Sequence, residues 1–198
     1  MSVFETAGHR AEVARRDDIV ALQAFFEANP TYTRLVEGRE VAPDAAATEF
    51  DDGPPAQFAF DRRWLLLVRE RASGELVGVI DGVKDLLAPG IWHVGLFFVA
   101  ERLHGSGFAA GLHAALQDWM QGQGARWLRL NVVDRNLRGA RFWRRQGYAF
   151  VCPREWTAPS GRVNTVWTLV KPLAGESLAG YLGAQTRDTL QPEPPGWA

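Results

Sequence analysis

The sequence contains few groups that could crosslink the chain, carry it across a membrane or draw it to a polyanion. A single cysteine in 198 residues, Cys152, excludes an internal disulfide framework and favours a reducing compartment. The formal net charge of −1 leaves no basic excess for a general nucleic-acid or membrane surface. No apolar run approaches the roughly 18 residues of a membrane-spanning helix, and the first residues lack a signal-peptide segment. We therefore expect a cytoplasmic protein with no nucleic-acid or membrane partner.

What is present is the composition of an ordinary globular protein. Hydrophobic residues make up 46% of the chain and charged residues 23%. The sequence has no internal repeat and no dividing linker, so its length suits one domain with a substantial core. From Pro172 the composition shifts to Gly, Ala, Gln and Pro. We predict a single domain over residues 1–171 and a C-terminal extension over residues 172–198.

Hydrophobic periodicity predicts a mixed order of strands and helices. The expected strands cover 10–15, 64–70, 76–83, 94–99, 127–133, 148–156 and 163–170. The expected helices cover 17–28, 43–50, a segment from Phe108 closed by Gly122 and Gly124, and a segment that begins at Asn136. A further helix is expected within 177–189, residues 1–9 should be a loose lead-in, and residues 31–41 are ambiguous. This order indicates a mixed α/β fold.

The most informative stretch runs from Trp92 to Phe150. Its first strand is followed by the glycine turn His104-Gly105-Ser106-Gly107 and then by the helix that begins at Phe108. A helix N-terminus presents unpaired N–H groups and a positive dipole end, which together favour an anion. Because glycine has no Cβ, a ligand can approach the backbone closely at such a turn. The pattern is typical of a phosphate cradle, although the glycines could also serve only to turn a strand into a helix.

Two common nucleotide-binding patterns fit this turn poorly. A P-loop needs Lys-Ser or Lys-Thr after the second glycine, where this chain has Phe108-Ala109. A dinucleotide fingerprint can be matched as Gly105-x-Gly107-x-x-Ala110, which keeps an oxidoreductase open as an alternative. That function would need a second βαβ half, and the hairpins on either side of the stretch do not supply one.

Two motifs, separated by the predicted helix and strand, fit another family. They are HGSGFA at 104–109 and NLRGARFWRRQGY at 136–148. The first is similar to the (Arg/Gln)-x-x-Gly-x-(Gly/Ala) signature of the GNAT superfamily of acetyl-CoA-dependent N-acetyltransferases. The second resembles that superfamily's N-x-x-A-x-x-(F/L)-Y-x-x-x-G-F segment. The motifs stand in the family's order, and the joint match is more specific than either motif alone.

The resemblance implies a fold, a cosubstrate and a set of binding residues. The implied fold is a central mixed sheet of about six to seven strands flanked by about four helices. Acetyl-CoA, with no metal, would lie between the strands at 94–99 and 127–133, which splay apart in that family. The implied cofactor-binding residues are Phe97, Phe98, Val99, His104, Gly105, Ser106, Gly107, Phe108, Ala109, Asn136 and Trp143. Asn136 would contact the pantetheine arm or cap its helix, and one or two arginines of that helix could reach the phosphates.

Two positions depart from the family pattern. His104 replaces the usual Arg or Gln, although its main-chain N–H could still meet the pyrophosphate. Trp143 stands where many members carry a tyrosine that protonates the departing thiolate, and tryptophan cannot be a general acid. The thiolate of a thiol with a pKa of about 8.5 leaves without much help from a general acid. Trp143 could instead form part of the wall of the thioester pocket. Because Trp143 replaces the tyrosine, an alternative function stays open, that of a non-catalytic module that only binds acyl-CoA as a sensor or regulator.

The expected reaction is direct attack of a neutral amine on the thioester, which requires a proton acceptor. His93 is our candidate, because it shares strand parity with Gly95, Phe97 and Val99 and has a suitable ordinary pKa. Its position is about where some histone-acetylating relatives place a glutamate. The alternative is a histidine held by hydrogen bonds in the sheet. Asp81 and Asp85 on the preceding strand are the second choices.

The acceptor side is the least defined part of the predicted site. In the family's architecture the first two helices line it, and here this segment carries Asp44, Glu49, Asp51 and Asp52. This acidity would draw a cationic amine, unless it is a plain solvated loop. We expect the acceptor to be the amine of a small molecule or a peptide. A homodimer and a longer acyl donor remain open.

Overall fold

One mixed sheet organises the protein, and the computed structural model describes it over residues 2–197. The sheet has eight strands in the order β1-β2-β3-β4-β5-β6-β8-β7. Neighbouring strands are antiparallel except for β5 and β6, which are parallel. The strands are β1 Ser2–Glu5, β2 His9–Val13, β3 Arg62–Glu70, β4 Leu76–Lys84, β5 Ile91–Val99, β6 Trp127–Val133, β7 Ala149–Thr157 and β8 Val163–Pro172.

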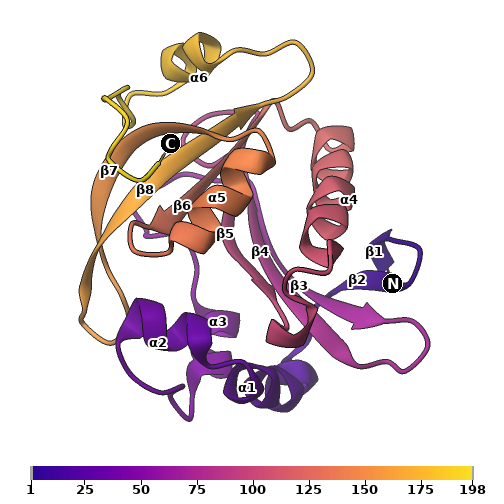
Figure 1. Cartoon of the computed structure of the whole chain (residues 1–198). Coiled ribbons are helices and arrows are strands. Elements are labelled where there is room, and N and C mark those ends of the chain that lie inside the picture. Colours follow the sequence, from indigo (N-terminus) through magenta and orange to yellow (C-terminus); the bar gives the residue numbers. More distant parts are fainter. Residues whose placement is uncertain (1, 198) are drawn as a thin grey trace.

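Six α-helices within the described residues cover the two faces of this sheet (Figure 1). They are α1 Ile19–Ala28, α2 Thr31–Glu37, α3 Ala45–Asp51, α4 Phe108–Gly122, α5 Leu137–Arg145 and α6 Leu178–Ala184, with short 3₁₀ turns at Arg16–Asp18 and Glu101–Leu103. Helices α4 and α5 pack on one face, which we call the cofactor face. The other four pack on the opposite face, which we call the acceptor face. No helix in the described part is long and apolar enough to cross a membrane.

The main core lies between the sheet and the helices of the cofactor face. Alternate residues of the strands point into it, as the two-residue period of a strand requires. Five of the eight tryptophans are buried: Trp92, Trp127, Trp143, Trp167 and Trp197. Trp197 lies beyond the last helix, and its ring is 6.1 Å from that of Trp167. Tryptophan side chains therefore supply a large part of the core.

The predicted mixed α/β sheet is confirmed, with more elements than expected. The additional strand is β1, in a segment that we predicted to be a loose lead-in. It pairs antiparallel with β2, and the ring of Phe4 packs 6.1 Å from that of Trp119. The ambiguous segment 31–41 contains α2, which ends at Gly38 in the left-handed conformation. The helix expected within 177–189 is α6.

Candidate active site

The sheet opens between β5 and β6. These parallel strands pair only from Ile91 with Trp127 to Val94 with Leu130, although both strands continue. Beyond this point β5 pairs only with β4, and β6 pairs only with β8. Among residues 2–197, the side of β5 that faces β6 therefore has no strand partner along its last five residues, and this backbone edge could pair with an extended ligand. This is the wedge that the family resemblance implies.

A β-bulge at Gly95 lies where the opening begins. Asp81 pairs with Leu96 and Gly82 with Val94, so Gly95 is an extra residue without a counterpart on β4. A Cβ at this glycine would lie 2.7 Å from Oδ2 of Asp81. Only glycine leaves room for that carboxylate. A glycine within a strand is the signal that predicts a bulge or a close approach.

The glycine turn lies between β5 and α4, on the side of the wedge where the strands have parted (Figure 1). Gly105 and Gly107 have φ values of 82° and 88°, which other residues rarely adopt. A Cβ at either position would meet no protein atom within 4 Å. Within residues 2–197, no group accepts a hydrogen bond from the N–H of Gly105, Gly107 or Ala109. The turn therefore offers free donors and open space at the start of a fifteen-residue helix.

The neighbouring side chains of the turn bond within it. His104 donates from Nε2 to the main-chain oxygen of Val99 at 3.0 Å, so its ring is folded back onto β5. Ser106 donates to the main-chain oxygen of Leu103 at 2.7 Å and accepts from the N–H of Phe108. The Phe108 ring packs 4.5 Å from that of His9. The N–H of His104, which was expected to meet the pyrophosphate, donates to the main-chain oxygen of Glu101 at 3.1 Å, and the N–H of Ser106 donates to that of Leu103. The backbone donors that are free for an anion are therefore those of Gly105, Gly107 and Ala109.

Trp143 forms part of an aromatic wall beside the wedge. Its ring lies 5.3 Å from that of Phe97 and 4.8 Å from that of Phe142. Behind it, Nε2 of His113 lies 3.1 Å from the hydroxyl of Tyr148. Phe98 faces the other way and stacks 5.7 Å from Phe26. Among the predicted cofactor-binding residues, Phe97 and Trp143 thus bring side chains to the wedge, whereas Phe98 could contribute only its backbone.

The helix after β6 begins with a capping residue. Oδ1 of Asn136 accepts a hydrogen bond from the N–H of Gly139 at 2.9 Å, which is the capping role that we had weighed against pantetheine contact. The bond leaves the amide nitrogen of Asn136 available as a donor. Five exposed arginines lie on or just before α5: Arg135, Arg138, Arg141, Arg144 and Arg145.

His93 does not point where strand parity predicted. The bulge at Gly95 changes the alternation of β5, so that His93 faces the acceptor side while Phe97 and Val99 face the cofactor side. Nη1 of Arg129 lies 3.2 Å from Nδ1 of His93. Burial and the charge of Arg129 lower the pKa of His93 to about 3. Such a histidine is a weak proton acceptor at neutral pH, so its surroundings do not support the predicted role of general base.

A pair of carboxylates shares one arginine beside the bulge at Gly95. Nε of Arg63 donates to Oδ1 of Asp81 at 3.0 Å, which leaves Oδ2 of Asp81 facing Gly95. The same guanidinium lies 3.5 Å from the carboxylate of Glu49 on α3 and donates to the last carbonyls of that helix. Burial and the charge of Asp81 raise the pKa of Glu49 to about 8, and burial raises that of Asp81. Asp85, the other second choice, lies in the turn at the far end of β4.

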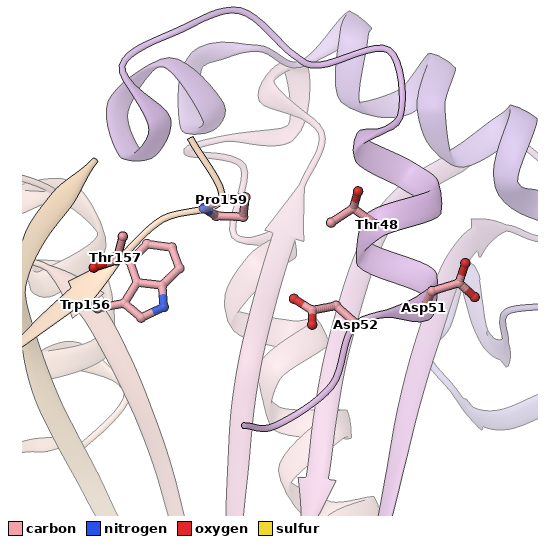
Figure 2. A pocket seen from close by; sticks show the side chains of 6 residues that line it. All are labelled: Thr48, Asp51, Asp52, Trp156, Thr157 and Pro159. Atoms are coloured by element: carbon pink, nitrogen blue, oxygen red, sulfur yellow. The ribbon is translucent and has the colours of Figure 1, made fainter. Parts of the chain in front are cut away.

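A pocket of about 520 Å³ is lined in part by residues that flank Glu49 in the sequence, although neither Glu49 nor Asp81 is among its lining residues. Figure 2 shows its two walls. One wall has Thr48 and Asp51 on α3 and Asp52 just after it, and the other has Trp156 and Thr157 at the end of β7 and Pro159 just beyond it. Asp52 points across the pocket toward Trp156, whereas Asp51 points away and pairs with Arg16 at 2.5 Å. Helix α2 is tied to the same hairpin, because the N–H of Ser160 donates to Glu37 at 2.9 Å. The volume suits a small organic molecule.

Comparisons with known proteins agree with this geometry. A family model described as "Acetyltransferase (GNAT) family" matches residues 23–148. An acetyltransferase from Thermus thermophilus is 20% identical, with a TM-score of 0.62, over 87% of this chain and 100% of that chain. A structure described as a probable GNAT acetyltransferase, from Chromobacterium violaceum, is 16% identical with a TM-score of 0.70 over 87% of each chain.

A third solved structure holds ligands. It is spermidine N-acetyltransferase from Vibrio cholerae in complex with CoA and spermine, at 14% identity and a TM-score of 0.62 over 84% of this chain and 96% of that chain. No curated protein matches the chain. At sequence identities of 14% to 20%, the solved structures show only that the fold is shared. The assignment to a family rests on the family model.

Proposed function

The chain belongs to the GNAT acetyltransferase family, and from this premise we propose that it transfers the acetyl group of acetyl-CoA directly to a cationic primary amine at the acceptor face. Family membership makes it an acetyl-CoA-dependent N-acetyltransferase with an amine acceptor. The class of the amine and the roles of individual residues are the proposed part. The observation that carries them is the position of Asp81, whose free carboxylate oxygen faces the bulge at the mouth of the wedge.

In this proposal the cofactor face holds acetyl-CoA. The free N–H groups of Gly105, Gly107 and Ala109 receive the pyrophosphate, supported by the N-terminus of α4. The unpaired edge of β5 pairs with the pantetheine arm, as an added strand would. Trp143 and Phe97 shield the thioester from water. A backbone N–H of this edge is then placed to stabilise the oxyanion that forms on attack.

The acceptor face supplies the amine and removes its proton. Asp52 attracts the ammonium form into the pocket, and Oδ2 of Asp81 accepts the proton directly or through one water. The neutral nitrogen attacks the thioester carbon and then loses its second proton to solvent, the carbon–sulfur bond breaks, and the CoA thiolate leaves with the electron pair. Burial raises the pKa of Asp81, and the charge of Asp52 adds to this effect, whereas the charge and hydrogen bond of Arg63 oppose it.

The absence of a tyrosine general acid is compatible with this route. Trp143 is buried at the family's tyrosine position and has only an indole N–H. The departing thiolate belongs to a thiol with a pKa of about 8.5, so it is a good leaving group at neutral pH. Solvent can protonate it after the bond breaks.

Asp81→Asn tests the proposal, because asparagine keeps the size of the side chain and cannot accept the proton. We expect kcat for CoA release with a primary amine to fall by about 100-fold or more, while the Kd for acetyl-CoA is unchanged. Asp85→Asn is the matched control, since Asp85 accepts from the N–H of Gly90 at the other end of the same strand. A kcat within about threefold of the wild type in Asp81→Asn would remove Asp81 from the proton-transfer step.

A further inference from the structure

The C-terminal segment forms part of the acceptor face through one buried carboxylate. Asp188 is fully buried and accepts from Nε of Arg129 at 2.8 Å and from Nη2 of Arg154 at 2.7 Å. The hydroxyl of Tyr181 donates to it at 2.5 Å. Burial opposes the ionised form, but the hydrogen bonds from Arg129 and its neighbours lower the pKa of Asp188 to about 2. The carboxylate is therefore charged and its oxygens are occupied.

The positive charge around Asp188 exceeds its single negative charge. Arg129 and Arg154 share this carboxylate, and the main-chain oxygen of Arg187 also accepts from Arg154. The Arg187 side chain is exposed, and within residues 2–197 it has neither a carboxylate partner nor a hydrogen bond. Its guanidinium lies 4.5 Å above the ring of Phe58. Burial and the charges of Arg154 and Arg129 lower the pKa of Arg187, and the opposing charge of Asp188 offsets them only in part.

Two chain segments connect this basic group to the lining of the acceptor pocket, which includes Trp156 on one wall and Asp52 on the other. Arg154 precedes Trp156 by two residues in a regular part of β7, so both side chains lie on the acceptor face. Phe58 belongs to the loop that leads from Asp52 to β3. The connection runs from Asp52 along this loop to Phe58, Arg187 and Arg154, and returns at Trp156. Carboxylates thus lie on the α3 wall of the pocket, and the guanidinium groups of Arg154 and Arg187 lie along the chain segments that lead away from its two walls.

We propose that the acceptor carries an anionic group in addition to its amine, and that Arg187, supported by Arg154, binds that group. The inference rests on the proposed function and specifies its substrate class. An arginine fork matches the oxygens of a carboxylate or a phosphate. The amine of such a molecule lies toward Asp52 and Asp81, and its anionic end lies over the C-terminal segment.

A matched series of acceptors tests this polarity. The series consists of primary alkylamines of one chain length whose far end is methyl, carboxylate, phosphonate or ammonium, each assayed by CoA release with the full-length protein. We expect kcat/KM for the carboxylate or the phosphonate amine to exceed that of the methyl amine by about 10- to 100-fold, the range of a charged hydrogen bond. The better of these two identifies the anion. The ammonium-ended amine should be the poorest.

Variants of Arg187 test whether this residue causes the preference for amines with an anionic end. Arg187→Gln should raise KM for the preferred anionic amine about tenfold and leave the methyl amine unchanged. Arg187→Glu should shift the preference toward the ammonium-ended amine. Arg62→Gln is the matched control, because Arg62 is exposed and lies 5.6 Å above the ring of Trp64 on the opposite face. None of these residues belongs to the proposed proton-transfer machinery.

Two outcomes would overturn the inference, and they can be told apart. If the methyl or ammonium amine is used as well as the anionic ones, or Arg187→Gln affects all amines equally, the anionic subsite is refuted and the proposed acetyl transfer stands. If acetyl-CoA binds but no amine of the series releases CoA, amine transfer as proposed fails together with the subsite that depends on it.

Discussion

At the scale of single residues, the account depends on which carboxylates face the pocket. Four acidic residues of the segment before β3 were expected to draw a cationic amine, and the structure separates two of them clearly. Asp52 points across the pocket, whereas Asp51 points away and pairs with Arg16 (Figure 2). Glu49 lies deeper, where it shares Arg63 with Asp81. Neighbouring residues in the sequence therefore have different expected effects.

Asp52→Asn should weaken amine binding, and Asp51→Asn should not. Removal of one carboxylate from the pocket loses an attraction of about 1 kcal/mol, so KM for the amine should rise roughly fivefold with kcat little changed. Steady-state kinetics of the two variants with the same amine make the comparison. An equal effect of both substitutions would mean that general acidity, and not the geometry of Asp52, attracts the acceptor.

At the scale of elements, the sequence predicted the strands and helices that carry a clear period or a glycine boundary. It did not predict β1, because a strand of four residues is too short to show an alternation. It also gave the wrong direction for His93, because a bulge at one glycine reverses the alternation of β5 and periodicity assumes a regular strand. The glycine turn was located from its motif, since its backbone geometry depends on local residues alone.

Contacts between distant elements were beyond sequence analysis. Arg129 and Asp188 are 59 residues apart, and nothing in either segment indicates that they meet. The same holds for Arg63, which joins Glu49 of α3 to Asp81 of β4. Such pairs depend on how the helices lie across the sheet, so a charged residue in a strand was the only available signal. The carboxylate pair of the site was for this reason only partly anticipated.

The contact between β6 and the C-terminal segment should contribute strongly to stability. Asp188→Asn leaves the buried guanidinium of Arg129 without its counter-ion, and we expect a loss of about 3 kcal/mol in the free energy of unfolding. Glu176→Gln breaks the ion pair with Arg126, which is more exposed than the Asp188 pair, and should cost less than about 1 kcal/mol. Denaturant titrations of both variants measure the difference. Similar losses would show that burial of the Asp188 pair does not matter.

At the scale of the whole molecule, buried histidines should make the protein sensitive to acid. Burial and the charge of Lys171 lower the pKa of His113 to about 4, whereas in the unfolded chain it returns to its ordinary value of about 6.5. Between these values the unfolded state binds more protons than the folded state, so stability is lost as the pH falls from about 6.5 to about 4. His93 adds to this loss in the same direction.

His113→Gln should reduce the sensitivity, because glutamine can still bond to Tyr148 and does not titrate. We expect the decrease in unfolding free energy between pH 6.5 and pH 4 to become smaller by about 3 kcal/mol. Urea titrations at several pH values give this slope for both proteins. An unchanged slope in the variant would mean that His113 is charged in the folded protein, contrary to its burial.

The whole account requires that acetyl-CoA bind at the glycine turn, and calorimetric titration of the full-length protein tests this most directly. The comparison is between the wild type, the double variant Gly105→Ala and Gly107→Ala, and Gly74→Ala. Gly74 also has a positive φ and open space around it, so its substitution matches the backbone strain without touching the turn. We predict micromolar binding to the wild type and to Gly74→Ala, and a loss of about tenfold or more in the double variant. Equal binding by all three proteins would contradict the assignment of the turn as the phosphate cradle, and no binding by the wild type would contradict the proposed use of acetyl-CoA.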